Sequence, residues 1–457
     1  MTVIIRFIIY TLLIILYVIS TLIASSYLIF ITGLCAFFAL LISFFYAKGL
    51  HFYSGVCFFS IGFFLFIYNV TYNDLQWHHF FLHFKPMLGI LSLFLVLPFI
   101  NCLIKVGKYH QSLNQLLQHR IPNLNKLYNR SFIICHILGV FLNIATIPLL
   151  SNSLKNSLQP LPKKRADKFY TQNLLRAYAL CLTWSPLEVM VITALDVTNT
   201  NYFKFFPSII SIVLIIILID WIVSRFRDST VILEVKYNEH SSIKGILKKT
   251  LELFLYLFGI VLIVSFIQHF LHKGFLFSMV LVIIPFSLGW SYVIGKFKRY
   301  VKVTLPHWKA RTIGLSNYFC MFLSAGFFVE MLIYSESLLF LQELFNKASE
   351  HTLVFYLLIG GYFLIASLTG FHPLVSLTLL VALLNPILPA VSSLSLAIVL
   401  VTSSLASVMY SPFNLSVSIL AEQLNLNPYR MGSWNLLFAL SYMIISIAIS
   451  YLIHVFI

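Results

Sequence analysis

The feature that most constrains this chain is a series of thirteen apolar runs, most of them long enough to form one membrane span. Crossing the hydrocarbon core of a bilayer takes about 20 apolar residues in a helix. Charged residues make up only 10% of the 457 residues, against about a quarter in soluble proteins, so a soluble fold is excluded. The sequence therefore predicts an all-α polytopic membrane protein. The runs are 3–23, 26–47, 51–69, 86–104, 131–154, 171–196, 205–223, 251–271, 274–295, 317–335, 353–386, 393–421 and 432–456.

The charge balance is strongly basic, with 30 Lys and Arg against 14 Asp and Glu. In a soluble protein this excess would indicate nucleic-acid binding, but in a membrane protein it is typical of cytoplasmic loops. We therefore expect no nucleic-acid partner. The sequence has no Walker motif, zinc-ligand cluster or nucleophile elbow. We accordingly expect no catalytic residue, metal site or cofactor, and ATP-driven transport within this chain has no support.

Two of the runs do not fit a simple crossing. The run 131–154 is basic on both flanks, and the run 353–386 is too long for one span and contains Gly370 and Pro373. If both are re-entrant hairpins, the other eleven runs cross and nearly all Lys and Arg lie inside. The positive-inside rule favours this arrangement, in the cytoplasmic membrane, with the N-terminus inside and the C-terminus outside. The basic residues left outside are Lys85, Lys204, Lys273 and Lys347.

The two hairpin runs resemble each other. Both contain Pro-Leu, an aliphatic residue and Ser, starting at Pro148 and Pro373, and each precedes a run broken by aromatic-Ser-Pro, at Trp184–Pro186 and Tyr410–Pro412. Each half then has five crossings and one hairpin, so the halves have opposite orientations. Inverted repeats with broken helices are the architecture of secondary transporters. The predicted parts are a leading helix 1–25, which we expect to be uncleaved although it could pass for a signal peptide, a first repeat 26–223, a cytoplasmic connection 224–250 and a second repeat 251–457.

Polar residues at the hairpin tips and helix breaks form the predicted site. A Pro in a helix frees backbone groups, and in lipid each freed group needs protein, water or substrate to satisfy it. Paired breaks should therefore line a cavity, and the half-helices that follow them suit an anion. Each residue also has a plainer interpretation as a turn former, helix cap or packing residue. The predicted substrate- or ion-binding residues are Asn143, Thr146, Ser185, Glu188, Ser367, Thr369, His372, Ser411 and Asn414.

Glu188 follows Pro186 by two residues. An ionisable residue near mid-membrane is functional by default, and in the first turn of a half-helix its carboxylate is stabilised by the helix dipole. We expect Glu188 to bind a coupling ion, Na⁺ or H⁺. The alternative is a structural cap or an ion pair, for which Arg176 is the candidate partner. Asp220 is expected at a helix end, where charge is ordinary.

The basic segment 105–130 also carries spaced Leu and Ile residues. This pattern predicts an amphipathic helix on the inner membrane face, with Lys and Arg toward anionic lipid. The segment 234–250 shows a weaker pattern of the same kind. Membrane lipid is therefore an expected partner.

This layout resembles the ion transporter superfamily, in particular the divalent anion:sodium symporters. The tips of that family carry Ser-Asn-Thr followed by Ala-Thr, and Leu142–Thr146 is similar to a degenerate form. Its broken helices carry Thr/Ser-Pro-Pro-Asn, of which Ser411–Asn414 keeps three positions and Ser185–Glu188 keeps two, with Glu replacing Asn. The second tip, Ser367–Thr369, has Leu in the middle position. These departures argue against simple transfer of dicarboxylate and sodium, and leave proton coupling or another anion open.

The resemblance implies an elevator mechanism for a small, anionic organic solute. Hairpins and broken helices would form a transport domain, and the helices of roughly 26–104 and 251–335 would form the scaffold of a homodimer. Two other interpretations stay open, a membrane enzyme or polymerase acting on lipid-linked sugars and a non-transporting subunit of a larger complex. Short outer segments with few acidic residues disfavour the first, and the paired breaks disfavour the second. The sequence does not decide the solute, or between uptake and efflux.

Overall fold

The structure, a computed structural model, describes residues 2–109, 123–228 and 243–456, and every regular element in these ranges is a helix. Within these ranges, twelve segments are long and apolar enough to cross a membrane. They coincide with twelve of the thirteen apolar runs, and the remaining run, 353–386, is divided into two shorter apolar helices. The prediction of an all-α polytopic membrane protein is confirmed.

The chain divides into two compact units, and neither is continuous in sequence. The first consists of Met1–Val106, Phe266–Lys347 and Thr378–Ile387, and the second of Gly107–Ser265, Ala348–Leu377 and Leu388–Ile457. Each unit therefore draws on both halves of the chain.

The first unit is built around the pairing of α3 with α14, and α2 packs along both α1 and α14. The packing is close: a Cβ at Gly33 of α2 would lie 2.0 Å from the carbonyl oxygen of Phe81. Aromatic rings fill the centre, where Phe84 stacks on Phe327 with ring centroids 4.8 Å apart. The helices are α1 (Thr2–Ile23), α2 (Ser26–Tyr46), α3 (Gly49–Tyr72), η1 (Trp77–Phe84), α4 (Leu88–Gly107), α12 (Phe275–Val293), α13 (Phe297–Gly314), α14 (Ser316–Tyr334) and most of α15 (Leu339–Ser349).

The sequence analysis did not anticipate α13. Lys and Arg interrupt its apolar residues, so it has no long apolar run and is not a candidate span. Two aromatic side chains attach it to α4: Trp308 Nε1 donates to the carbonyl oxygen of Leu95 (2.9 Å), and the Tyr300 hydroxyl donates to that of Phe99 (3.0 Å). Tertiary hydrogen bonds of this kind leave no periodic signal in the sequence.

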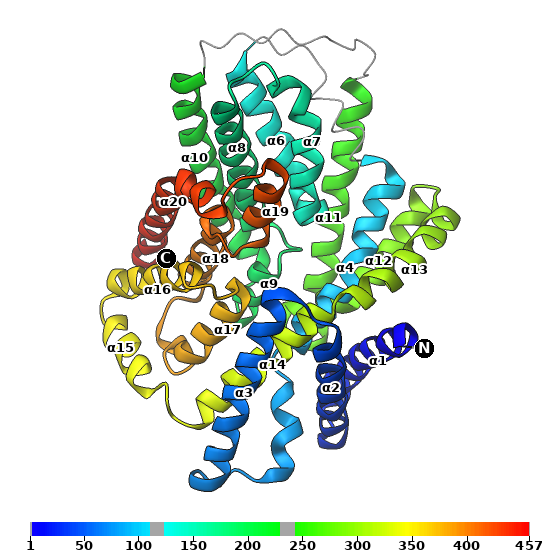
Figure 1. Ribbon diagram of the computed structural model, residues 1–457, viewed down its shortest axis with the longest axis vertical. Coiled ribbons are helices and arrows are strands. Elements are labelled where there is room, and N and C mark those ends of the chain that lie inside the picture. Colours follow the sequence, from blue (N-terminus) through cyan, green and yellow to red (C-terminus); the bar gives the residue numbers. More distant parts are fainter. Residues whose placement is uncertain (1, 110–122, 229–242, 457) are drawn as a thin grey trace. The chain divides into compact units, whose positions relative to one another are not determined.

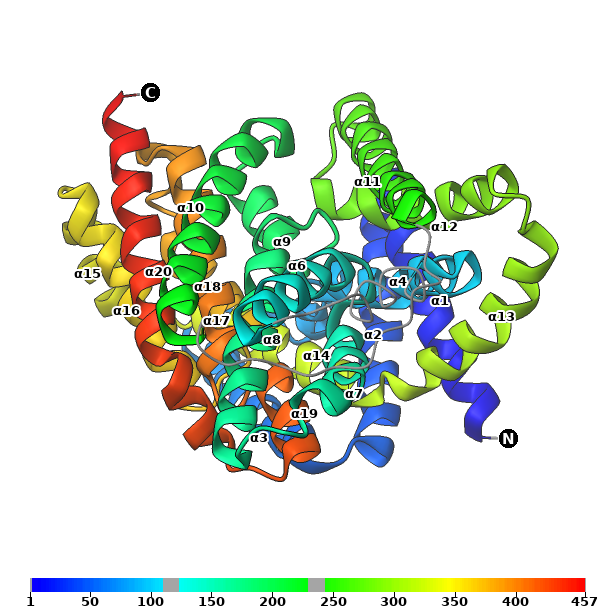
Figure 2. The same ribbon diagram turned by 90° about the horizontal axis from the view of Figure 1, so that it is seen from above.

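The second unit contains the first predicted hairpin, the tip of the second hairpin and both broken helices, while residues 378–384 of the second hairpin belong to the first unit. In Figure 1, α6, α7, α8 and α10 lie side by side, and Figure 2 shows α10, α18 and α20 packed together. The helices are α6 (Leu124–Leu142), η3 (Asn143–Ala145), α7 (Thr146–Leu158), α8 (Lys163–Trp184), α9 (Val189–Val197), α10 (Tyr202–Asp228), most of α11 (Ile243–Leu271), α16 (Thr352–Leu368), the start of α17 (Pro373–Leu384), η4 (Leu388–Ala390), α18 (Ser393–Tyr410), α19 (Leu415–Leu424) and α20 (Pro428–Phe456).

All four predicted helix interruptions are present. The run 131–154 is interrupted between α6 and α7, and the run 353–386 between α16 and α17. The Ser-Pro sequences separate α8 from α9 and α18 from α19. Proline and glycine thus located three of the four interruptions, whereas in the first hairpin Pro148 lies inside α7 and the interruption is at Asn143–Ala145.

The predicted amphipathic segments are only partly described. Of 105–130, residues 110–122 lie outside the described residues, while the flanking parts end α4 and begin α6. Of 234–250, the described part, 243–250, is the start of α11 and not a separate helix. That part of the expectation is wrong, because the polar start of α11 continues directly into its apolar span.

Candidate functional site

The two Ser-Pro breaks have the same backbone conformation. Ser185 has φ −68° and ψ 121°, and Ser411 has φ −69° and ψ 123°. A residue before proline is excluded from the helical region by the proline ring, so each helix ends at this serine. The short sequence pattern Ser-Pro therefore fixes the local geometry of both breaks.

The second halves of the broken helices begin later than expected. Glu188 and Asn414 have extended backbones and are the N-caps of α9 and α19, which start at Val189 and Leu415. The sequence analysis placed Glu188 within the first turn of its half-helix. In the structure Glu188 precedes the first turn of α9. As the N-cap, Glu188 still has its carboxylate at the positive end of the half-helix, where the N–H groups of the first turn have no helical partners.

The first hairpin tip and the first break form one polar group around Asn143. The Asn143 side-chain oxygen accepts hydrogen bonds from the Ile144 N–H (2.7 Å) and from the Tyr178 hydroxyl, and its Nδ2 lies 3.5 Å from Glu188 Oε2. The backbone of Asn143 has φ 50° and ψ −135°. For a residue with a Cβ this conformation costs on the order of 1–3 kcal/mol, a cost that surrounding contacts must offset.

The Glu188 carboxylate is half-buried at the centre of this first group. It makes no ion pair with any residue that the structure describes. A carboxylate in a membrane interior requires a partner of opposite charge or a proton. Its described contacts, to the Asn143 amide and to the N–H groups of Met190 and Val189, are all neutral, so no described group compensates its charge.

The second hairpin tip and the second break form a group of neutral side chains. The Ser411 hydroxyl donates to the carbonyl oxygen of Ser367 (2.7 Å), and the Ser367 hydroxyl shares a hydrogen bond with the Tyr410 hydroxyl (2.7 Å). The Asn414 side-chain oxygen accepts from the N–H of Ser416 (3.1 Å) and from its hydroxyl (2.8 Å). These contacts attach the tip to the break and cap α19.

Two further predicted residues belong to the first tip and break. Thr146 begins α7 and is buried, and its hydroxyl has no hydrogen-bond partner among the described residues. The Ser185 hydroxyl oxygen accepts from the N–H of Leu187 (3.3 Å) and so stabilises the turn at the break.

The remaining two predicted residues, at the second tip, form hydrogen bonds to backbone groups within four residues in the sequence. Thr369 is exposed and its hydroxyl donates to the carbonyl oxygen of Ile365 (3.0 Å). The Nδ1 atom of His372 accepts from the N–H of Leu374 (3.2 Å) at the start of α17. Both contacts are typical of helix ends.

The two groups stand on helices that pack against each other. Helix α18 contacts both α8 and α9, and α19 contacts α7. The Ser151 hydroxyl of α7 donates to Gln423 Oε1 of α19 (2.8 Å). The second arm of the first hairpin therefore packs on the second broken helix.

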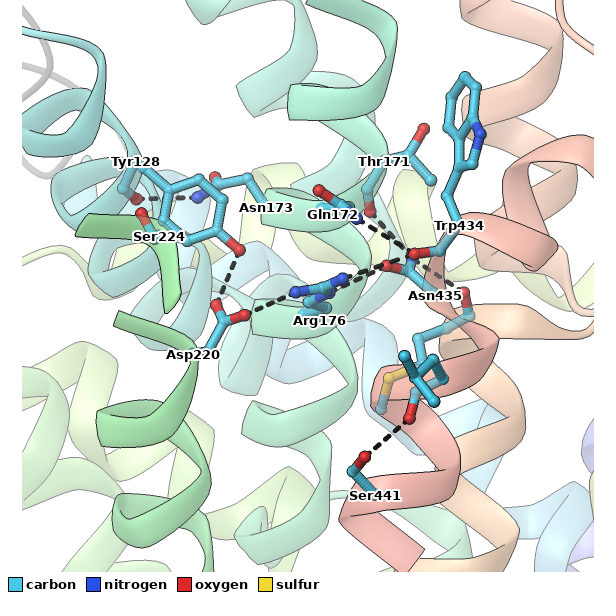
Figure 3. Close-up of polar contacts among 12 residues, drawn as sticks. Tyr128, Thr171, Gln172, Asn173, Arg176, Asp220, Ser224, Trp434, Asn435 and Ser441 are labelled. Carbon is cyan, nitrogen blue, oxygen red and sulfur yellow. Dashed lines mark hydrogen bonds and ion pairs between the residues drawn. The ribbon is translucent and has the colours of Figure 1, made fainter. Parts of the chain in front are cut away.

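A buried ion pair joins α8 to α10 within the same unit (Figure 3). Arg176 Nη1 of α8 is 2.6 Å from Asp220 Oδ1 of α10, and both side chains are at most 7% exposed. The other carboxylate oxygen of Asp220 accepts from the Tyr128 hydroxyl (2.7 Å), and Arg176 Nε donates to Asn435 Oδ1 (2.9 Å). The expected pairing of Arg176 with Glu188 is therefore wrong, and Asp220 lies in the body of α10 and not at its end.

Asn435 extends this network to the second broken helix. Its Nδ2 donates to the carbonyl oxygens of Thr171 in α8 (3.2 Å) and Met409 in α18 (3.1 Å). The network thus connects α6, α8, α10, α18 and α20. The signal that could have found it is the presence of one Arg and one Asp in adjacent apolar runs, 171–196 and 205–223, since each needs a partner in lipid.

The two tyrosines of the site were missed. Tyr410 directly precedes Ser411, and Tyr178 lies seven residues before Ser185. Tyr410 is the aromatic residue of the second aromatic-Ser-Pro motif but was given no role in the site. Tyr178 has no distinguishing sequence signal, because aromatic residues are frequent throughout this chain. Only the folded tips reveal that each hydroxyl bonds to a hairpin tip.

No protein-family model matches the chain, and no curated protein matches its sequence. The structure is similar to the crystal structure of the YdaH transporter of Alcanivorax borkumensis, which is described as having an unusual topology, with a TM-score of 0.53 and 14% identity. The similarity covers 81% of this chain and 86% of that one. At this identity the likeness concerns the fold alone, and the fold of this chain resembles that of a membrane transporter.

Proposed function

We propose that the protein is a secondary transporter that moves a small, anionic organic solute across the cytoplasmic membrane, coupled to Na⁺ or H⁺. The observation that carries the proposal is the hydrogen bonding of each hairpin tip to a helix break within one compact unit. Substrate sites of secondary transporters lie between such discontinuous helices. The fold likeness to a transporter supports the same conclusion.

The solute site is assigned to the tips and the N-termini of α9 and α19. Free N–H groups and the positive ends of two half-helices attract an anion. In this proposal the nine polar residues predicted from the sequence surround the solute and its coupling ion, with Tyr178 and Tyr410 orienting the tips. The proposal is strongest for Asn143, Glu188, Ser367 and Ser411, because their contacts join tip to break.

Glu188 is assigned the coupling role. Its half-buried carboxylate has no counter-ion among the residues that the structure describes, whereas the buried carboxylate of Asp220 in α10 is paired with Arg176. Binding of Na⁺ or H⁺ would neutralise Glu188 and reduce the repulsion of an anionic solute. The ion and the solute would thereby bind more strongly together than separately.

The motion is assigned to the second unit as a whole. It contains both tips and both breaks, so an elevator movement of this unit against the first would carry the intact site across the membrane. We further propose the inverted-repeat arrangement, a homodimer scaffolded by the first unit, and hairpins that enter and leave on one side. Labelling of Lys126→Cys and Gln159→Cys, at the two ends of the α6–α7 hairpin, should report the same, cytoplasmic side.

The solute can be found with purified protein. A thermal-shift screen against panels of organic anions, each with Na⁺ or choline and at several pH values, should yield an anion whose stabilisation depends on the cation or on pH. Proteoliposomes should then accumulate that anion only under the matching ion gradient. Stabilisation by lipid-linked sugars alone, with no anion effect and no gradient-driven uptake, would contradict the proposal.

A further inference from the structure

An apolar groove of about 800 Å³ lies within the second unit, between α6, α10 and α11, and reaches the first break at Trp184 and Pro186. Three of its lining residues bond to one another: Trp184 Nε1 donates to His136 Nε2 (2.8 Å), and the Tyr202 hydroxyl donates to the Trp184 carbonyl oxygen (2.6 Å). Trp221 Nε1 is buried without a hydrogen-bond partner among the described residues. The rest of the lining is almost entirely aliphatic and aromatic. The groove therefore suits a hydrocarbon chain.

The rim of the groove lies in candidate membrane spans. Ile133 of α6, Leu214 and Leu218 of α10 and Phe258 of α11 line it and are exposed, with between 42% and 57% of their surface accessible. Exposed apolar side chains in spanning helices face the hydrocarbon of the bilayer. A lipid chain can therefore enter from the side.

On α10 the lining stripe ends in a positive charge. Leu214, Leu218 and Trp221 line the groove, and Arg225 follows at the same helical spacing and is exposed. Tryptophan is the residue enriched at the level of lipid headgroups. The end of this stripe thus has the order hydrocarbon, interface, charge.

On α6 the same change occurs at the same end. Ile137 and Ile133 line the groove, and Arg130 and Lys126 continue that stripe at helical spacing. The two helix ends are adjacent, because the Ser224 hydroxyl of α10 donates to Asn125 Oδ1 of α6 (3.0 Å). Three basic side chains therefore gather at one mouth of the groove.

We propose that this groove binds an anionic phospholipid, with an acyl chain between α6, α10 and α11 and the phosphate near Lys126, Arg130 and Arg225. From Trp221 to Tyr202 the groove follows α10 for about 28 Å at 1.5 Å per residue. This is close to the full hydrocarbon core of about 30 Å, so the half next to the basic residues has the depth of one leaflet and accommodates an acyl chain. In the orientation expected from sequence this mouth is cytoplasmic, where anionic lipids attract basic residues. The inference does not depend on the transport function.

Binding of the lipid's acyl chain is tested by filling the groove with larger side chains. Intact-mass spectrometry of protein purified in mild detergent should detect bound phospholipid, and phosphatidylglycerol should raise the melting temperature more than phosphatidylcholine. Leu218→Trp should reduce both the bound lipid and the phosphatidylglycerol shift several-fold. The matched control is Ile219→Trp, at an exposed position of α10 that does not line the groove, and it should behave as the native protein. Leu214→Phe provides a second, smaller filling variant if Leu218→Trp does not fold.

The phosphate is tested by removing charge. The double variant Lys126→Gln with Arg225→Gln should lose most of the preference for phosphatidylglycerol over phosphatidylcholine, whereas Lys298→Gln, on an exposed position of α13, should keep it. If both filling variants retain the lipid content of the native protein and its phosphatidylglycerol-induced rise in melting temperature, the proposal is wrong. Unchanged lipid preference after charge removal would also overturn it. A filling variant that keeps its lipid but weakens solute binding would assign the groove to the solute instead.

Discussion

The break after Trp184 and the break after Tyr410 bend the chain through the same dihedral angles, yet their side chains differ in chemistry. The first contains a half-buried carboxylate, Glu188, which has no counter-ion among the described residues. At the equivalent position of the second, the neutral Asn414 is fully engaged in capping α19. The same backbone conformation therefore presents an ionisable side chain at the first break and a neutral capping side chain at the second.

The helices that lead into the two breaks differ in the same way. α8 contains several charged residues, and its buried Arg176 is anchored by Asp220, whereas α18 contains no charged residue and is attached through hydroxyl and amide groups. The difference teaches that charge near the first break is of two kinds: one pair that neutralises itself and one carboxylate that does not. The first kind should govern stability and the second function.

The largest expected effect on stability comes from breaking the charge pair of α8. Arg176→Gln leaves Asp220 buried without its counter-ion, and removal of one partner of a buried pair destabilises by about 3–5 kcal/mol. Thermal unfolding in detergent should show a marked fall in melting temperature. The control Lys298→Gln removes an exposed positive charge and should change little.

The double variant Arg176→Gln with Asp220→Asn sharpens this result. It removes both charges and keeps hydrogen-bonding groups, so it should recover a large part of the lost stability. A double variant no more stable than the single one would show that the pair contributes through packing and not through charge.

A smaller difference is expected between the two helix caps. Asn414 accepts from the N–H of Ser416, and replacing such a cap by Ala costs about 1 kcal/mol. The contacts of the Glu188 carboxylate with the N–H groups of Met190 and Val189 fall short of capping geometry, so Glu188→Ala should cost less. Equal losses of melting temperature in the two variants would mean that Glu188 is a structural cap like Asn414.

Effects as small as those at the caps are expected at the tips. Tyr410→Phe and Tyr178→Phe each remove one hydroxyl that bonds to a hairpin tip, at a net cost of about 0.5–1.5 kcal/mol. The two should be alike in thermal stability. They should differ in the concentration of coupling ion that gives half of the maximal rise in melting temperature. Only Tyr178→Phe should change this concentration, because only Tyr178 bonds to Asn143, which contacts Glu188. If Tyr410→Phe also changed this ion concentration, the assignment of ion binding to the first break alone would be contradicted.

Much of the fold and part of the site could be predicted from the sequence. Long apolar runs predicted the spans, because lipid leaves helices few alternatives. Pro186 and Pro412 located the breaks, because proline restricts the residue before it wherever it occurs. These signals are local, and they survive without knowledge of the tertiary structure.

The missed features depend on contacts between distant segments. The pairing of Arg176 with Asp220 depends on how α8 faces α10, which neither helix encodes alone. Tyr178 reaches Asn143 because α6 and α8 are adjacent, and α13 is held by hydrogen bonds to α4. Glu188 was placed in the first turn of its helix but is the N-cap of α9, because the start of a helix after Ser-Pro depends on the turn that follows the proline.

The central claim is that the Glu188 carboxylate binds the coupling ion. The most direct measurement is ion-gradient-driven accumulation of the identified anion in proteoliposomes by the native protein, by Glu188→Gln and by the control Glu422→Gln, which removes an exposed carboxylate on α19. The account predicts that native protein and Glu422→Gln accumulate the solute above equilibrium, while Glu188→Gln loses accumulation and keeps solute exchange without a gradient. Accumulation by Glu188→Gln with unchanged ion dependence would contradict it.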